Sequence, residues 1–196
     1  MKSIHEKFIR RDIPVQAVST STQTTSLAKS FGIEILDFNT VKDLEVVIDG
    51  ADEVDPNKNL IKGGGGALLM EKLVANFSKD LIIIVDQTKL VNTLGNFPLP
   101  IEIVKFGSEK TKEHIYSLLN DLDYINFEIF FRKDQGNNYL TDESNFILDL
   151  HLNEIKDPYT LNQQLLMIPG VIEVGLFLNM ASKVIVGQND NSIRIF

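Results

Sequence analysis

Two aspartates, a lysine, a run of glycines and a glutamate lie close together in one stretch of this sequence. Asp49 and Asp52 follow an apolar run at residues 45–48 that is typical of a strand. Lys62 precedes four consecutive glycines, and Glu71 follows them in a helical pattern. Carboxylates can transfer protons, and bare backbone amides before a helix can bind an anion. Ordering each glycine costs conformational entropy, so a run of four indicates more than a simple connection.

Alternating strand-like and helical patterns in the first half predict an open α/β sheet. Strands are expected at residues 15–18, 33–36, 45–48 and 81–85. A helix around Leu27 is expected to end at Gly32. The strand at 81–85 is apolar throughout, which predicts burial of both its faces. A second helix is expected from about residue 67 to 79, with one apolar stripe formed by Leu69, Met70, Leu73, Val74 and Phe77.

These elements would bring the chemical residues to one edge of the sheet. Asp86 ends the strand at 81–85, as Asp49 ends the preceding strand, and Lys89 lies three residues further on. Ligands of open α/β sheets bind outside the carboxyl ends of the strands, so Asp49, Asp52, Lys62 and Lys89 can meet there. Glu71 would lie in the second turn of the following helix.

Each feature also has a structural interpretation. Asp49 and Asp52 could form turns, the glycines could be a tight connection, and Asp86 could cap the next element. Glu71 and Lys89 could be solvated surface residues. Only the combination of these residues, and no single one of them, favours a functional site.

The signal changes after the proline-rich segment at residues 97–100, which is typical of a domain edge. A strand at 101–106, a helix through Ile115 and Leu119, and two alternating apolar runs at 127–131 and 146–152 predict a small α+β unit with an antiparallel sheet. Asp157-Pro158 is expected to open another helix. We therefore predict an open α/β part before this segment and a smaller antiparallel α+β part after it.

Composition excludes several classes of function. A net charge of −8 disfavours nucleic acid as a partner, and no apolar run approaches the length of a membrane span. The absence of cysteine excludes disulfides and thiolate catalysis and fits a cytoplasmic location. His5, His114 and His151 show no ligand spacing, so a metal site is not expected. The glycines match neither GxxxxGK[ST] nor GxGxxG.

The assembled motifs resemble those of the type A ribose-5-phosphate isomerase family. The similar segments are DGADEVD at residues 49–55, IKGGGGA at 61–67, VDQTK at 85–89, FPLPIE at 97–102 and PGVIEVGLF at 169–177. The resemblance implies interconversion of ribose 5-phosphate and ribulose 5-phosphate in the pentose phosphate pathway, without metal or cofactor. It also implies a Rossmann-like domain, which we place at residues 1–98 and 172–196, and a smaller ferredoxin-like lid at residues 99–171. A homodimer or homotetramer is implied as well.

The resemblance also implies a role for each matching residue. Glu71 matches the catalytic base, Asp49 matches a sugar-binding carboxylate that assists ring opening, and Lys62 matches the group that holds the reacting oxygen. Lys89 matches a lysine near the phosphate. The implied substrate-binding residues are Asp49, Gly50, Ala51, Asp52, Lys62, Gly63, Gly64, Gly65 and Lys89.

One segment of the family pattern has no counterpart here. The family carries a Gly-Thr-Gly-Ser-Thr phosphate loop, and residues 19–22 do not match it. We therefore expect this chain to bind the sugar phosphate weakly and to isomerise it slowly. The alternatives are a non-catalytic sugar-phosphate sensor on a related fold, a transferase with a nucleophilic glutamate, or a truncated isomerase of low activity.

Overall fold

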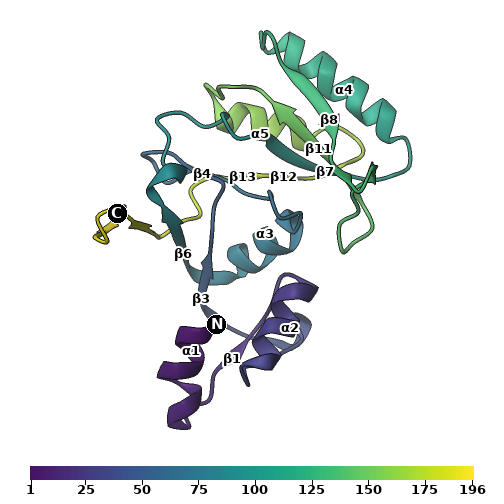
Figure 1. The fold of residues 1–196 in the computed structure, drawn as a ribbon. Coiled ribbons are helices and arrows are strands. Elements are labelled where there is room, and N and C mark those ends of the chain that lie inside the picture. Colours follow the sequence, from purple (N-terminus) through teal and green to yellow (C-terminus); the bar gives the residue numbers. More distant parts are fainter. The chain divides into compact units, whose positions relative to one another are not determined.

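The computed structural model describes residues 1–196, which form two compact units, residues 1–44 and 45–196 (Figure 1). In the first unit, β1 and β2 pair in parallel and α2 connects them. Gly32 follows α2 with a φ of 72°, so the expected helix end is confirmed. The elements of this unit are α1 (Lys2–Lys7), η1 (Ile9–Arg11), β1 (Gln16–Ala17), α2 (Thr22–Ser30), β2 (Glu34–Ile35) and η2 (Phe38–Thr40).

The second unit contains a four-stranded mixed sheet with the order β15-β14-β6-β3. Its central strands β6 and β14 are parallel, and β15 is antiparallel to β14. The strands are β3 (Leu44–Asp49), β6 (Ser78–Asp86), β14 (Lys183–Gly187) and β15 (Ile193–Ile195). The expectation that β6 is buried on both faces is wrong: Ile83 is fully buried, but Ile84 is 50% exposed. The period-two alternation of a strand turns Ile84 to the opposite face, which stays partly open.

A small sheet of order β13-β5-β4 and the helix α3 lie beside this sheet (Figure 1). Their bounds are β4 (Glu53–Val54), β5 (Leu60–Ile61), α3 (Leu68–Phe77) and β13 (Leu176–Phe177). The predicted apolar stripe of α3 is only partly buried, because Leu73 is 50% and Phe77 is 45% exposed. The buried residues of the helix are instead Leu68, Val74 and Ala75. The packing of α3 therefore depends on its first turn as well as its middle.

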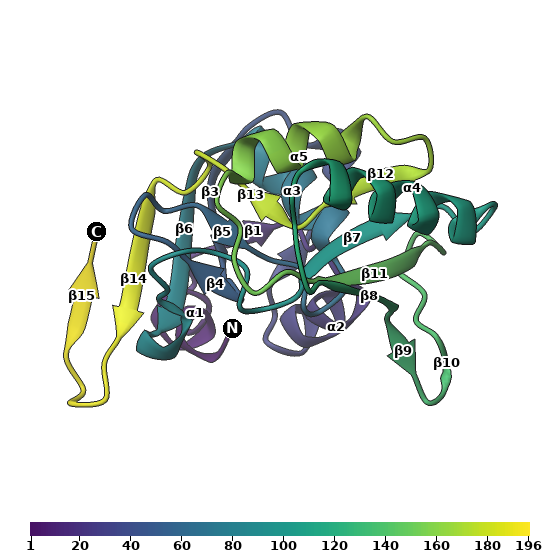
Figure 2. The same ribbon diagram turned by 90° about the horizontal axis from the view of Figure 1, so that it is seen from above.

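The remaining elements form a four-stranded antiparallel sheet of order β12-β7-β11-β8, with two helices against one face (Figure 2). Its strands are β7 (Leu99–Ile103), β8 (Glu128–Phe131), β11 (Phe146–His151) and β12 (Val171–Val174). The helices are α4 (Ser108–Asp121) and α5 (Pro158–Leu166), and the hairpin strands are β9 (Lys133–Asp134) and β10 (Asn137–Asn138). Asp157 caps α5 by accepting hydrogen bonds from Tyr159 N and Thr160 N, as predicted.

The observed fold class is the one expected: a Rossmann-like α/β part with parallel strands and a smaller antiparallel α+β part. The domain boundaries near residues 98 and 171 stay a prediction. No helix of the protein has both the length and the apolar character that crossing a bilayer requires.

Candidate active site

Lys62 lies at the centre of the charged cluster. It directly follows β5, and its backbone N–H donates to Gly175 O across to the segment before β13 at 2.9 Å. The residue is only 3% exposed. Its ammonium group donates to Gly50 O at 2.7 Å and lies 2.9 Å from Asp49 Oδ2 and 3.1 Å from Glu71 Oε2. The fold thus brings together residues from the end of β3, the loop after β5 and helix α3.

The charged groups of this cluster shift one another's pKa values. Burial works to lower the pKa of Lys62, but the carboxylates of Glu71 and Asp49 outweigh it and raise that pKa above its ordinary value. Burial raises the pKa of Glu71, and Asp49 adds to this effect, while Lys62 opposes it. Glu71 Oε2 is buried without a hydrogen bond of good geometry. Lys62 is therefore a firmly protonated cation, and Glu71 is a carboxylate of increased basicity.

The conformation of the glycine loop depends on Asp52 and on Tyr139. Gly64 N donates to Asp52 Oδ2 at 2.8 Å, and a Cβ at Gly64 would lie 2.6 Å from Asp52 Oδ1. Gly66 has a φ of 86°, and a Cβ there would collide with the Tyr139 hydroxyl. Gly65 differs, because nothing lies within 4 Å of the corresponding position. Gly63 also needs to be glycine, because its φ is 107° and a Cβ there would lie 3.0 Å from Leu68 Cβ. The surrounding atoms therefore leave little room for a side chain at Gly63, Gly64 and Gly66, whereas Gly65 is open.

Helix α3 begins directly after this loop. Its N-cap is Ala67, which provides no side-chain hydrogen bond, so the amides of the first turn remain available to an anion. Glu71 lies in the first turn of α3, and the expectation of the second turn is wrong because the helix begins at Leu68. Glu71 therefore lies nearer the N-terminal end of the helix than the sequence pattern indicated.

Lys89 lies in the short helix that follows β6, at the same sheet edge as Gly50. A cavity of about 570 Å³ is lined there by Gly50, Ala51, Ile84, Val85, Asp86, Lys89, Gly187, Gln188 and Asn189. Asp86 accepts from Thr88 N at 2.8 Å and so caps η3 (Gln87–Lys89), the structural role that its position at the strand end suggested. The cavity and the charged cluster share Gly50, whose carbonyl oxygen binds Lys62.

Several residues near the site were not predicted from the sequence. Arg132 donates to the carbonyl oxygens of Gly63 and Gly64 at 2.7 and 3.0 Å. Tyr139 lies against Gly66, and Gln188 and Asn189 line the cavity beside Lys89. No local motif marks these residues, because they come from hairpins that approach the site only in the folded chain.

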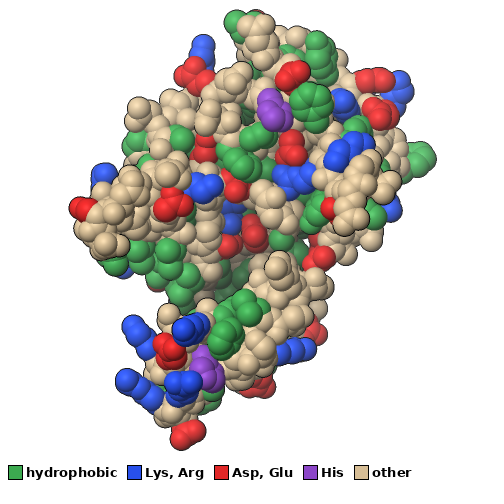
Figure 3. Space-filling view, in the orientation of Figure 1, with side chains coloured by type: hydrophobic (Ala, Val, Ile, Leu, Met, Phe, Trp, Pro, Cys, Tyr) green, Lys and Arg blue, Asp and Glu red, His purple; other side chains and the backbone are tan.

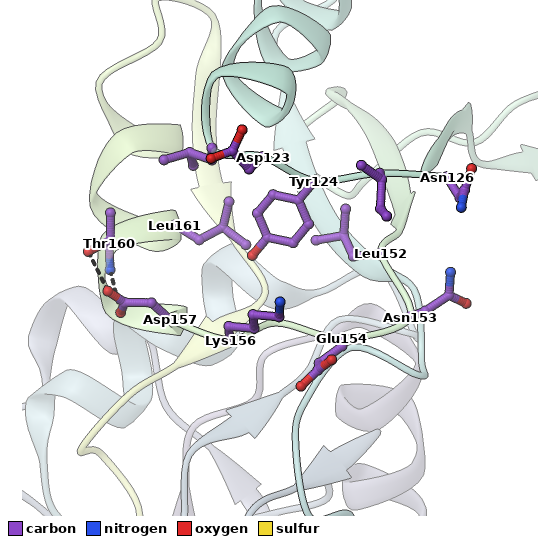
Figure 4. Close-up of a pocket in the computed structure, with 12 residues that line it drawn as sticks. Asp123, Tyr124, Asn126, Leu152, Asn153, Glu154, Lys156, Asp157, Thr160 and Leu161 are labelled. Carbon is purple, nitrogen blue, oxygen red and sulfur yellow. Dashed lines mark hydrogen bonds between the residues drawn. The ribbon is translucent and has the colours of Figure 1, made fainter.

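A separate cavity of about 460 Å³ lies between the end of α4, the end of β11 and the start of α5 (Figure 4). Its lining includes Tyr124, Leu152 and Leu161, and burial, with help from Asp157 and Glu154, raises the pKa of Tyr124 to about 12. None of the predicted site residues lines it. The lysine–carboxylate cluster at the glycine loop therefore has the stronger claim to chemistry, because it combines an acid–base group with anion-binding amides.

The protein contains no group of three or more His, Cys, Asp or Glu side chains placed to hold a metal ion. On the face that Figure 3 shows, acidic and basic side chains are interspersed. The net charge of −8 is therefore not gathered into one large acidic patch on that face.

A family model described as ribose 5-phosphate isomerase A (phosphoriboisomerase A) matches residues 16–191. A ribose-5-phosphate isomerase A of Dinoroseobacter shibae is 43% identical over 195 residues, covering 100% of this chain and 75% of the relative. A ribose-5-phosphate isomerase A 1 of Oceanobacillus iheyensis is 41% identical over 191 residues, covering 97% of this chain and 82% of the relative.

Solved structures show the same relationship. The ribose 5-phosphate isomerase of Plasmodium falciparum has a TM-score of 0.93 and 35% identity, covering 100% of this chain and 83% of the other. A D-ribose-5-phosphate isomerase in complex with phospho-erythronic acid has a TM-score of 0.88 and 36% identity, covering 100% of this chain and 83% of the other.

Proposed function

This chain belongs to the ribose 5-phosphate isomerase A family, and we propose that it interconverts D-ribose 5-phosphate and D-ribulose 5-phosphate with the cluster around Lys62. One observation carries the assignment of this site. A buried ammonium group lies within 3.1 Å of two carboxylates, beside a glycine loop and the uncapped start of a helix. This arrangement combines a base with groups that stabilise an oxyanion.

Glu71 is the base of the proposed mechanism. It takes the proton from C2 of the open-chain aldose, and the C2–H electron pair forms the C1–C2 double bond while negative charge develops on the C1 oxygen. A hydroxyl proton then passes from O2 to O1, and Glu71 returns the carbon-bound proton to C1 to give the ketose. The raised pKa of Glu71 supports this role, because a more basic carboxylate is better matched to proton removal near neutral pH.

Lys62 and the amides of the glycine loop stabilise the enediolate oxygen. Lys62 keeps its charge because the carboxylates raise its pKa, and Gly65 presents an open approach to the loop. Such electrostatic groups contribute about 10²–10³ in rate each. Asp49 and Asp52 accept hydrogen bonds from the sugar hydroxyls, and Asp49 also assists ring opening.

Lys89, Gly50 and Ala51 bind the part of the substrate that lies at the sheet edge, with Lys89 near the phosphate. The position of these three residues around one cavity supports their assignment to the same part of the substrate. We further propose that the chain acts in the cytoplasm as a homodimer or homotetramer, and that residues 99–171 form a lid over the Rossmann-like part.

The experiment that tests this function must distinguish an isomerase from a sugar-phosphate sensor. The purified chain is incubated with ribose 5-phosphate in D₂O and followed by ¹H NMR. An isomerase produces ribulose 5-phosphate and incorporates solvent deuterium at the reacting carbon in a fraction of turnovers. Saturable binding of ribose 5-phosphate with neither product nor deuterium incorporation would replace the isomerase with the sensor.

A further inference from the structure

Arg132 connects the antiparallel sheet to the glycine loop. It follows β8, and its guanidinium forms two bonds to Asp149, with Nε at 2.9 Å from Oδ2 and Nη2 at 2.5 Å from Oδ1. Its remaining nitrogen, Nη1, donates to Gly63 O at 2.7 Å and to Gly64 O at 3.0 Å. The ion pair is largely buried, with side-chain exposures of 15% and 18%.

These bonds determine the direction of two peptide planes. In a trans peptide, the C=O of one residue and the N–H of the next point to opposite sides. Since Gly63 O and Gly64 O both face Arg132, the N–H groups of Gly64 and Gly65 face away from it. Gly64 N accordingly donates to Asp52, whereas Gly65 N has no partner within the protein. Gly65 is also the loop residue with open space beside it.

We propose that Arg132 is a positioning residue, which directs the Gly65 N–H to the place where the negative oxygen develops in the reaction. The proposal rests on the proposed function of the site. Four consecutive glycines would otherwise sample many conformations, and stabilisation of an oxyanion requires donors that are already aligned. Arg132 supplies that alignment without contacting the substrate.

The geometry explains why the residue is arginine. One planar group binds both oxygens of Asp149 and two backbone carbonyls at once, which the forked donors of a guanidinium allow. Tyr139 assists, since the Arg132 guanidinium lies 6.0 Å from the centre of its ring and the Tyr139 hydroxyl donates to Gly65 O at 3.4 Å. A lysine retains the positive charge but has a single nitrogen, so it cannot keep all four bonds.

The test compares Arg132→Lys with wild type and with Arg194→Lys, a matched change at an exposed arginine of β15. We expect Arg132→Lys to lower kcat by about 10–100-fold while changing KM by less than about threefold, because a displaced donor affects the transition state more than substrate binding. Arg194→Lys should leave both constants unchanged. Added guanidinium ion should partly restore kcat in Arg132→Ala, which a purely structural role would not produce.

A kcat within twofold of wild type in folded Arg132→Lys overturns the proposal. A decrease in kcat that is fully explained by a larger unfolded fraction of the variant also overturns it. If Arg132→Lys does not fold, Asp149→Asn replaces it and should show the same loss of kcat. A second measurement separates this proposal from the proposed function. The Gly65 amide, followed by ¹⁵N NMR in the free protein, should become more mobile in Arg132→Lys, whether or not wild type isomerises ribose 5-phosphate; an unchanged amide refutes the positioning role.

Discussion

Replacement of Glu71 by glutamine removes the proposed base with little change of shape. Proton transfer by a positioned side chain contributes about 10²–10⁴ in rate, which corresponds to about 3–5 kcal/mol of activation free energy. Glu71→Gln should therefore lower kcat by at least about 100-fold. Binding of ribose 5-phosphate should change much less, because the amide keeps the volume of the carboxyl group.

The effect of this change on stability follows from the contacts of Lys62. The ammonium group loses one of two carboxylates but keeps Asp49 at 2.9 Å and Gly50 O at 2.7 Å. At the same time the variant removes a carboxylate whose ionised form burial disfavours. These effects oppose one another, so the free energy of unfolding should change by about 1 kcal/mol or less, which is a shift of about 2–4 °C in Tm.

The assay measures kcat and KM for ribulose 5-phosphate formation, together with thermal unfolding. The matched control is Glu113→Gln, which alters an exposed glutamate of α4 that pairs with Lys110. It should leave activity and stability unchanged. A Glu71→Gln variant that folds normally and retains more than about a tenth of wild-type turnover would refute Glu71 as the base.

The remaining predictions concern metals, titration and the glycine loop. Activity should survive exhaustive treatment with EDTA, whereas loss with recovery on adding a divalent ion would contradict Lys62 as the main electrophile. The pKa of Glu71, measured by ¹³C NMR, should lie above the 4.5 of an ordinary glutamate and rise further in Lys62→Met, because burial raises it and Lys62 lowers it; a fall in that variant would contradict the assigned interactions. Gly66→Ala should lower the free energy of unfolding by about 1–3 kcal/mol in chemical denaturation, because of its φ of 86° and the collision with Tyr139. Gly65→Ala should leave stability unchanged, because nothing lies within 4 Å of the added methyl group, but it should reduce activity. Equal losses of stability in Gly65→Ala and Gly66→Ala would contradict the open space beside Gly65.

Local sequence patterns predicted many of the helices and strands, and they singled out the lysine and carboxylates that the structure brings together. Apolar runs, the N-cap Asp157 and the helix end at Gly32 act over a few residues, so they can be recognised without a structure. The same holds for the lysine and glycines before Glu71, because their spacing along the chain already limits them to one loop and one helix. The exposure of Ile84 and Phe77 could not be predicted this way, because burial depends on which neighbouring elements cover each face.

Only the tertiary structure decided how the site is held together. Asp49 ends β3 and Lys62 directly follows β5, and their contact at 2.9 Å exists because the fold brings the ends of these two strands together. Arg132 and Asp149 lie far from the glycines in sequence, and antiparallel pairing of β8 with β11 places them beside the loop. The amino-acid sequence alone thus determined which groups are available for acid–base chemistry. Their distances, their shifted pKa values and the direction of the loop amides depend on long-range packing, which no local pattern encodes.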